Sequence, residues 1–155
     1  MNLIIILSII LLTIDQASKI LIVKFLDINN SIELIKSFFY LTYTHNTGAA
    51  FSILTGQRIF LIIIALLILI ILFKYIRKNK ISNKIETIAF SLVIGGSIGN
   101  LIDRIIRGYV IDFIDVKIFG YNFPVFNLAD TFIVIGVFLI LITMIRKEVK
   151  HDSRK

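Results

Sequence analysis

Four long apolar segments divide this chain and constrain its fold more than any other feature. They lie at about residues 3–25, 58–76, 85–103 and 128–146. A transmembrane helix needs about 20 mostly apolar residues, so each segment is long enough, or nearly so, to cross a bilayer. Of the 155 residues, 57% are hydrophobic and 17% are charged, whereas a soluble domain has about 45–50% and about 25%. The sequence therefore predicts one integral membrane domain over residues 1–155.

The first segment has one alternative interpretation, a cleaved signal peptide. It lacks a basic region before its apolar run and an A-x-A-like cleavage site, and the apolar run resumes after Lys19. We therefore expect it to remain in the protein as a transmembrane helix.

The lysines and arginines predict the orientation of these spans. Five lie in the loop between the second and third segments and five in the C-terminal tail: Lys74, Arg77, Lys78, Lys80, Lys84, Arg146, Lys147, Lys150, Arg154 and Lys155. Cytoplasmic loops carry an excess of such residues, so both termini should be cytoplasmic and residues 26–57 and 104–127 should form outer loops. This clustering beside apolar segments explains the formal charge of +7, so we expect no nucleic-acid partner.

The two outer loops contain strand patterns. Residues 38–44 are rich in aromatic and β-branched side chains, and the turn-like residues 45–48 follow them. Residues 109–119 form a second strand candidate, and Pro124 marks an extended segment before the fourth span. The predicted fold class is an all-α membrane protein, a four-transmembrane-helix bundle with a small β layer from the two outer loops.

Ionisable groups inside a membrane segment are costly, so each is a candidate functional residue. Asp15 and Lys19 are four residues apart and should share one helix face as an ion pair. The alternative is that Asp15 is the coupling carboxylate of a small proton-coupled transporter.

The third segment carries two overlapping motifs. Gly95 and Gly99 form G-x-x-x-G, which favours close helix packing in a membrane. The same residues match G-x-S-x-G, the pattern of a serine nucleophile, with Ser97 as nucleophile and His45 as base. We favour helix packing, because a nucleophile elbow needs a strand–turn–helix context. A polar stripe at helical spacing follows, comprising Asn100, Asp103, Arg104 and Arg107.

Two carboxylates should approach the outer membrane boundary from different elements. Asp112 lies in the second strand candidate between apolar neighbours, whereas Asp115 should point to the opposite face of that strand. Asp130 falls in the first turn of the fourth span, which Asn127 is placed to cap. If the two acids face each other, they share a proton as in aspartic proteases. A structural or transport role is the alternative at this point.

Five motifs, taken together and in order, resemble those of the bacterial lipoprotein signal peptidases, the type II signal peptidases. They are residues 15–19 (Asp-Gln-Ala-Ser-Lys), 46–51 (Asn-Thr-Gly-Ala-Ala-Phe), 95–104 (Gly-Gly-Ser-Ile-Gly-Asn-Leu-Ile-Asp-Arg), 110–113 (Val-Ile-Asp-Phe) and 126–130 (Phe-Asn-Leu-Ala-Asp). The resemblance covers essentially the whole chain.

The resemblance implies an aspartic endopeptidase of the bacterial cytoplasmic (inner) membrane. Such an enzyme removes the signal peptide of a prolipoprotein just before a cysteine that carries a diacylglyceryl group, so the implied partners are the bilayer and these substrates. By motif position, the catalytic pair would be Asp112 and Asp130, on the outer side of the membrane. The substrate-binding residues would be Asn46, Asn100, Arg104 and Asn127, and the supporting polar residues Asp15, Lys19 and Asp103.

Cofactors are not expected. The chain has no cysteine and only two histidines, His45 and His151, which excludes thiol catalysis and disfavours a histidine-rich metal site. The alternatives that remain are the transporter, the serine protease and a non-catalytic assembly subunit in which no single aspartate is essential.

Overall fold

The computed structural model describes residues 1–49, 53–79, 81, 83–118 and 120–152, and side chains as far as Glu148. Ala50 and Phe51 of the second motif lie outside the described residues, as do Lys80, Arg154 and Lys155.

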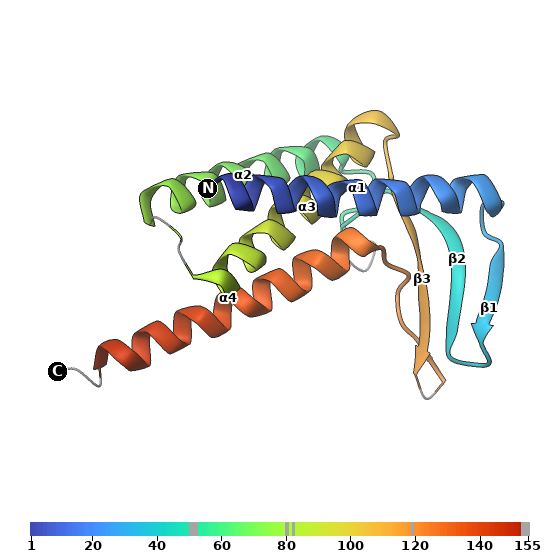
Figure 1. Ribbon diagram of the computed structural model, residues 1–155. Coiled ribbons are helices and arrows are strands. Elements are labelled where there is room, and N and C mark those ends of the chain that lie inside the picture. Colours follow the sequence, from blue (N-terminus) through green and yellow to red (C-terminus); the bar gives the residue numbers. More distant parts are fainter. Residues whose placement is uncertain (50–52, 80, 82, 119, 153–155) are drawn as a thin grey trace.

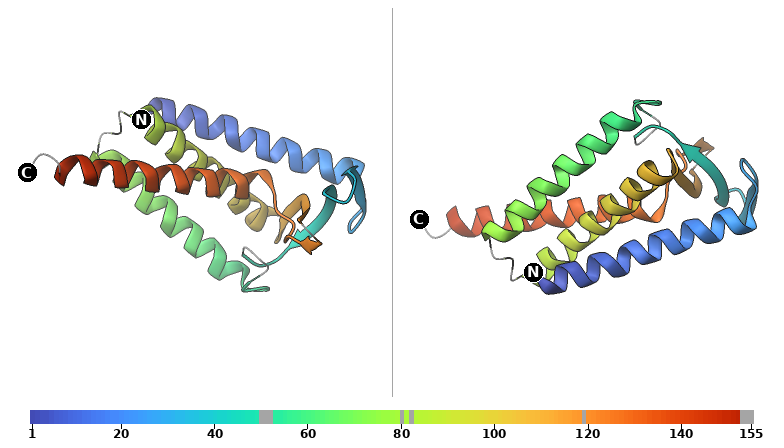
Figure 2. Two further views of the ribbon diagram at one scale, coloured as in Figure 1. Left: turned by 90° about the horizontal axis from the view of Figure 1, so that it is seen from below. Right: turned by 90° about the horizontal axis from the view of Figure 1, so that it is seen from above.

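Four long helices make up most of the molecule. They are α1 (Asn2–Phe25), α2 (Arg58–Asn79), α3 (Lys84–Ile106) and α4 (Leu128–Asp152). All four are long and apolar enough to cross a membrane. The N-terminus and the C-terminal end of α4 lie at one end of the helix bundle, and the sheet lies at the other end (Figures 1 and 2). The predicted fold class is confirmed.

Helix α3 is the central element of the bundle. Most of its span is buried, whereas only a small part of the spans of α1, α2 and α4 is buried. Its glycines explain this close packing. A Cβ at Gly95 would lie 2.9 Å from the carbonyl oxygen of Ser8 in α1, and one at Gly96 would lie 2.5 Å from that of Ala129 in α4. The interpretation of G-x-x-x-G as a helix-packing motif is confirmed.

The two connections at the sheet end form one antiparallel sheet in the order β1 (Ser31–Ile35), β2 (Phe39–Asn46), β3 (Val110–Ile118) and β4 (Tyr121–Asn122). Both strand candidates are present, but the predicted turn at residues 45–48 is partly wrong. His45 and Asn46 continue β2, because they pair with Ile111 and Val110 of β3.

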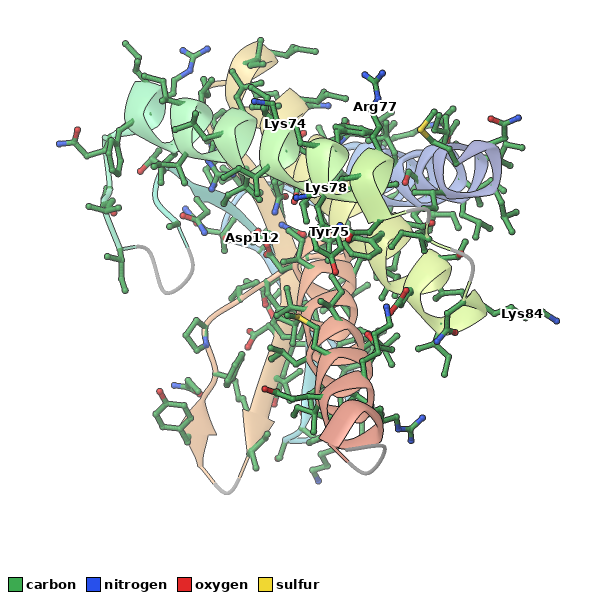
Figure 3. The ribbon with its side chains drawn as sticks, turned by 90° about the vertical axis from the view of Figure 1, so that its left-hand side faces the viewer. Lys74, Tyr75, Arg77, Lys78, Lys84 and Asp112 are labelled. Atoms are coloured by element: carbon green, nitrogen blue, oxygen red, sulfur yellow. The ribbon has the colours of Figure 1, made fainter. Side chains whose placement is uncertain are left out.

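The opposite end of the bundle is strongly basic. Lys74, Arg77 and Lys78 in the last turns of α2 and Lys84 at the start of α3 are exposed there (Figure 3). These cations are therefore far from the sheet along the helices, as the predicted orientation requires.

Candidate active site

Asp112 and Asp130 line the same cavity, although they come from different elements. Asp112 lies on β3 and Asp130 in the first turn of α4. Three backbone hydrogen bonds join β3 to Phe126, two residues before α4. Phe126 accepts from Phe113 and Ile114 at 3.0 and 2.7 Å and donates to Ile114 at 3.0 Å. This bridge brings the start of α4 next to β3. The cavity has a volume of about 340 Å³ and lies between the sheet and the ends of α3 and α4 that face it.

Asp112 is held by two side-chain amides. Asn46 donates to its Oδ2 at 2.8 Å and Asn127 donates to its Oδ1 at 2.6 Å. The residue is only 2% exposed. Burial, and then the nearby charge of Asp130, raise the pKa of Asp112 to about 7. This carboxyl group therefore changes its protonation near neutral pH.

Asp130 is held by a parallel set of donors. Asn100 Nδ2 donates to Asp130 Oδ1 at 2.7 Å, and the backbone N–H of Asn127 lies 3.4 Å from Oδ2. In return, Asn127 Oδ1 accepts from the backbone N–H of Asp130 at 2.9 Å, so the predicted N-cap of the fourth span is confirmed. Asn127 thus contacts both carboxylates.

The site asparagines have partners that the sequence did not indicate. In this structure the amide nitrogens of Asn46, Asn100 and Asn127 donate to the two carboxylates. Asn127 Nδ2 also lies 3.3 Å from Asn100 Oδ1. Their sequence-based role, which was to hold the substrate backbone, remains a prediction, and positioning of the acids is a second role.

Arg104 also lines the cavity, from the last turn of α3. Its Nη2 donates to the carbonyl oxygen of Gly48 at 2.7 Å, which places the segment after β2 beside the site. Asp103 is fully buried and bonded to Lys19 and Arg107.

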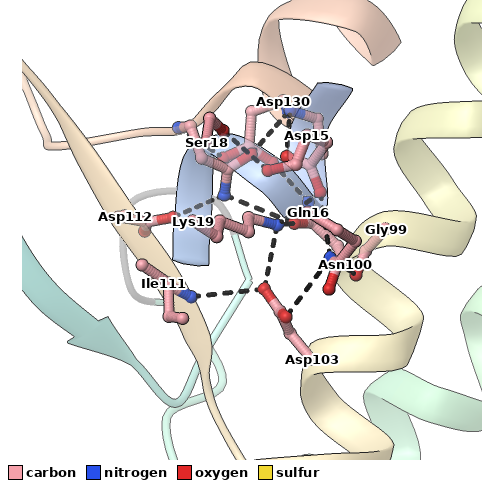
Figure 4. A network of polar contacts seen from close by, with 12 residues as sticks. Asp15, Gln16, Ser18, Lys19, Gly99, Asn100, Asp103, Ile111, Asp112 and Asp130 are labelled. Carbon is pink, nitrogen blue, oxygen red and sulfur yellow. Dashed lines mark hydrogen bonds and ion pairs between the residues drawn. The ribbon is translucent and has the colours of Figure 1, made fainter. Parts of the chain in front are cut away.

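Behind the carboxylates lies a buried polar network that contains the predicted supporting residues (Figure 4). Lys19 Nζ lies 2.9 Å from Asp15 Oδ2 and 2.8 Å from Asp103 Oδ2, so the predicted pair with Asp15 is confirmed and Asp103 is a second anion. Asp15 Oδ1 accepts from the backbone N–H of Ala129 at 3.0 Å. The network therefore connects α1, α3 and the start of α4.

Several residues that line the cavity are apolar, and no polar motif in the sequence points to most of them. The apolar part of the lining comes from the extended segment after β4 and from the first turns of α4, namely Phe123, Pro124, Val125, Phe126, Val134 and Ile135. Of these residues, the sequence singles out Pro124, as part of an extended segment, and Phe126, as the first residue of the motif 126–130. Gln16 was also missed as a network member, and its Nε2 donates to Asp15 Oδ2 at 3.1 Å and to the carbonyl oxygen of Gly99 at 3.2 Å.

The serine alternative gains no support from the geometry. Ser97 lies within α3 rather than at a strand–helix turn. His45 Nε2 is hydrogen-bonded to the Tyr43 hydroxyl at 2.8 Å, and its ring stacks on Tyr109 with 3.6 Å between centroids. Neither Ser97 nor His45 lines the cavity. Among the side chains that the structure describes, no group of three or more carboxylates and histidines could hold a metal ion.

Comparisons with known proteins agree with this architecture. The family described as Signal peptidase (SPase) II matches residues 7–146. The chain is 41% identical to the lipoprotein signal peptidase of Halalkalibacterium halodurans over 150 residues, which cover 97% of this chain and 96% of that protein. It is 42% identical to the lipoprotein signal peptidase of Staphylococcus carnosus over 149 residues, covering 96% and 90%.

Solved structures show the same fold. One bacterial membrane enzyme, determined by the in meso method at 2.3 Å resolution, matches with a TM-score of 0.89 and 39% identity, covering 96% of this chain and 90% of that one. A second, at 1.9 Å resolution, matches with a TM-score of 0.84 and 40% identity, covering 93% of each chain.

Fold, site and comparisons together define a bacterial multi-pass membrane enzyme. More particularly, the chain belongs to the signal peptidase II family, which is a family of proteases. The transporter alternative is not supported, since the relatives are peptidases and both oxygens of Asp15 are bonded within the buried network.

Proposed function

We propose that this chain is an aspartic endopeptidase that removes signal peptides from diacylglyceryl-modified prolipoproteins, just before the lipidated cysteine. Asp112 and Asp130 are its catalytic pair. The observation that carries the proposal is that these two carboxylates line one cavity and that the pKa of Asp112 is raised to about 7.

The chemistry follows from one shared proton. The ionised carboxylate takes a proton from a water molecule, while the protonated one donates to the oxygen of the scissile carbonyl. The amides of Asn46, Asn100 and Asn127 keep the two acids in place, because each donates to a carboxylate oxygen. Asn46, Asn100 and Arg104, which line the cavity, also bind the substrate backbone as it enters.

The apolar lining fits a substrate that arrives from the bilayer. Val134 and Ile135 lie on the first turns of α4, line the cavity and are exposed on the bundle surface. A peptide whose cysteine carries two acyl chains keeps those chains among lipids while its backbone reaches the acids.

A cleavage assay tests the proposed function. Purified protein in detergent is incubated with a diacylated prolipoprotein, and the product is followed by gel shift and by mass spectrometry of its new N-terminus. We expect a product that begins with the lipidated cysteine. The proposal is wrong if the substrate stays intact or if the cut falls elsewhere.

The pH dependence of activity should follow the acid pair. Because only the singly protonated pair is competent, we expect a bell-shaped rate profile whose alkaline limb reports loss of the last proton; its apparent pKa belongs to the pair.

The folded pKa of Asp112, about 7, exceeds its ordinary value of 3.8, so the stability of the fold should fall as the pH rises from about 4 to about 7. Melting curves of wild type and Asp112→Asn across this range measure the effect, and the variant should show the flatter dependence. An equally steep dependence in Asp112→Asn contradicts the assignment.

Ser97→Ala should keep most of the wild-type activity, within about threefold, and a chelator should not inhibit the enzyme. The reason is that Ser97 lies in a helix-packing segment and the proposed chemistry needs no metal. Cleavage rates of the variant, and of wild type with and without EDTA, check both expectations. An inactive Ser97→Ala protein at normal membrane levels restores the serine hypothesis.

Both termini should be cytoplasmic and the site should face the outer side of the membrane. Because the chain has no cysteine, a single introduced cysteine gives a unique label site. We expect Lys36→Cys and Lys117→Cys to react with an impermeant maleimide in intact cells, and Lys78→Cys and Lys84→Cys to react only after lysis. The opposite labelling pattern places the carboxylates on the cytoplasmic side and rejects this orientation.

A further inference from the structure

The buried ammonium group of Lys19 is connected to Asp130 by hydrogen bonds that run through one side chain, Asn100. Besides its two carboxylate partners, Lys19 Nζ donates to Asn100 Oδ1 at 3.0 Å. An ammonium group has three N–H donors and no acceptor. Asp15, Asp103 and Asn100 supply three acceptors, so each N–H has one partner.

This bond determines which way the Asn100 amide points. Because Lys19 only donates, the atom of Asn100 that faces it must be the carbonyl oxygen. The Asn127 amide lies on the same oxygen at 3.3 Å and requires the same orientation. The nitrogen of Asn100 is then directed at Asp130 Oδ1, which it reaches at 2.7 Å. A flipped amide would place an N–H against the ammonium and a carbonyl oxygen against the carboxylate.

The geometry points to Lys19 as a positioning residue for catalysis: it fixes the Asn100 amide so that its N–H holds Asp130 in the reactive position. This inference rests on the proposed function, since it assigns Asp130 to the reaction. Lys19 does not line the cavity, and the hydrogen bonds that join its side chain to the Asp130 side chain run through Asn100.

The same network also binds the start of α4, through Asp15. Its partner Asp15 accepts the backbone N–H of Ala129, the residue before Asp130, at 3.0 Å. Gly99 of α3 packs against the Asp15 carboxylate and leaves no space for a Cβ. Asp15 therefore holds the backbone before Asp130, whereas Asn100 holds the Asp130 side chain.

A double-mutant cycle in the full-length protein tests this role. The variants are Lys19→Met, Asn100→Ala and the two combined, assayed in detergent with a diacylated prolipoprotein. We expect Lys19→Met to lower kcat roughly 10–100-fold, as loss of outer-shell partners does elsewhere, with KM within about threefold of wild type. In the Asn100→Ala background the same substitution should change kcat by less than about threefold, because residues that act as a unit are not additive.

Two controls separate positioning from folding. Arg107→Gln removes another cation from Asp103, at 3.5 Å, without touching Asn100, and should keep kcat near the wild-type value. Lys19→Met removes the cation that Asp15 and Asp103 share and leaves Asp15 without one, so Asp103→Asn/Lys19→Met, which removes one charge of each sign, is the charge-balanced version and Asp103→Asn alone is its reference. We expect the charge-balanced variant to lose kcat roughly tenfold or more relative to that reference.

Three outcomes overturn the inference. The first is a folded Lys19 variant with wild-type kcat, and the second is a loss in the double mutant equal to the product of the single losses. The third is that neither Lys19 variant accumulates in folded form, which makes Lys19 a folding residue only. The proposed function fails separately, if wild type does not cleave or if Asp112→Asn and Asp130→Asn remain active.

Discussion

Asp112→Asn and Asp130→Asn should each reduce cleavage of a diacylated prolipoprotein by about 10²–10⁴-fold, the usual cost of losing general acid–base function. Asparagine keeps the shape of the side chain and one acceptor oxygen, but it cannot take a proton from water. Both positions line the same cavity and are linked through Asn127, so each acid depends on the other.

The double variant should be little slower than either single variant, because the two acids act on one proton. Initial rates at equal amounts of purified protein measure this, and membrane levels show whether each variant is folded. Multiplicative losses in the double variant would mean that the carboxylates act independently, which contradicts a shared-proton pair.

Asp15→Ala should cost folding stability on the order of 3 kcal/mol, the lower end of what breaking a buried ion pair costs. Alanine removes one anion from Lys19 and the acceptor for the Ala129 N–H. Lys19 keeps Asp103 at 2.8 Å, so the cation retains one anionic partner in this variant.

Thermal unfolding in detergent measures this loss, and Gln16→Ala is the matched control. Gln16 donates to the same carboxylate at 3.1 Å, but its removal leaves the ion pair intact. We expect it to cost about 1 kcal/mol, as for an ordinary hydrogen bond. Equal losses of folding stability in the two variants would show that the ion pair of Asp15 contributes no more than an ordinary hydrogen bond.

The apolar pattern predicts most of the fold, because the helices are fixed by local sequence and by the length needed to cross a bilayer. The sequence predicts strands at residues 38–44 and 109–119, and the structure has β2 at Phe39–Asn46 and β3 at Val110–Ile118. Strand β1 was missed because all of its residues are exposed, so it has no buried face to mark in the sequence. The end of β2 was missed because its pairing with β3 involves residues more than sixty positions away.

Contacts in the site between residues close in sequence are likewise predictable, whereas contacts between different elements are not. The cap at Asn127 and the pair of Asp15 with Lys19 are local, so spacing predicts them. The bonds from Lys19 to Asn100 and Asp103 join α1 to α3, and no local rule brings them together. The apolar cavity lining is not predicted for the same reason, since it combines the segment at Pro124 with side chains of α4.

The central claim is that Asp112 and not its neighbour on the strand is catalytic, and one comparison tests it most directly. Asp115 lies three residues further along β3, accepts from the Thr42 hydroxyl at 2.7 Å and does not line the cavity. Asp112→Asn and Asp115→Asn are assayed side by side with a diacylated prolipoprotein at equal folded protein. We predict that Asp115→Asn cleaves within about tenfold of wild type while Asp112→Asn is at least about 100-fold slower. An active Asp112→Asn beside an inactive Asp115→Asn contradicts the claim.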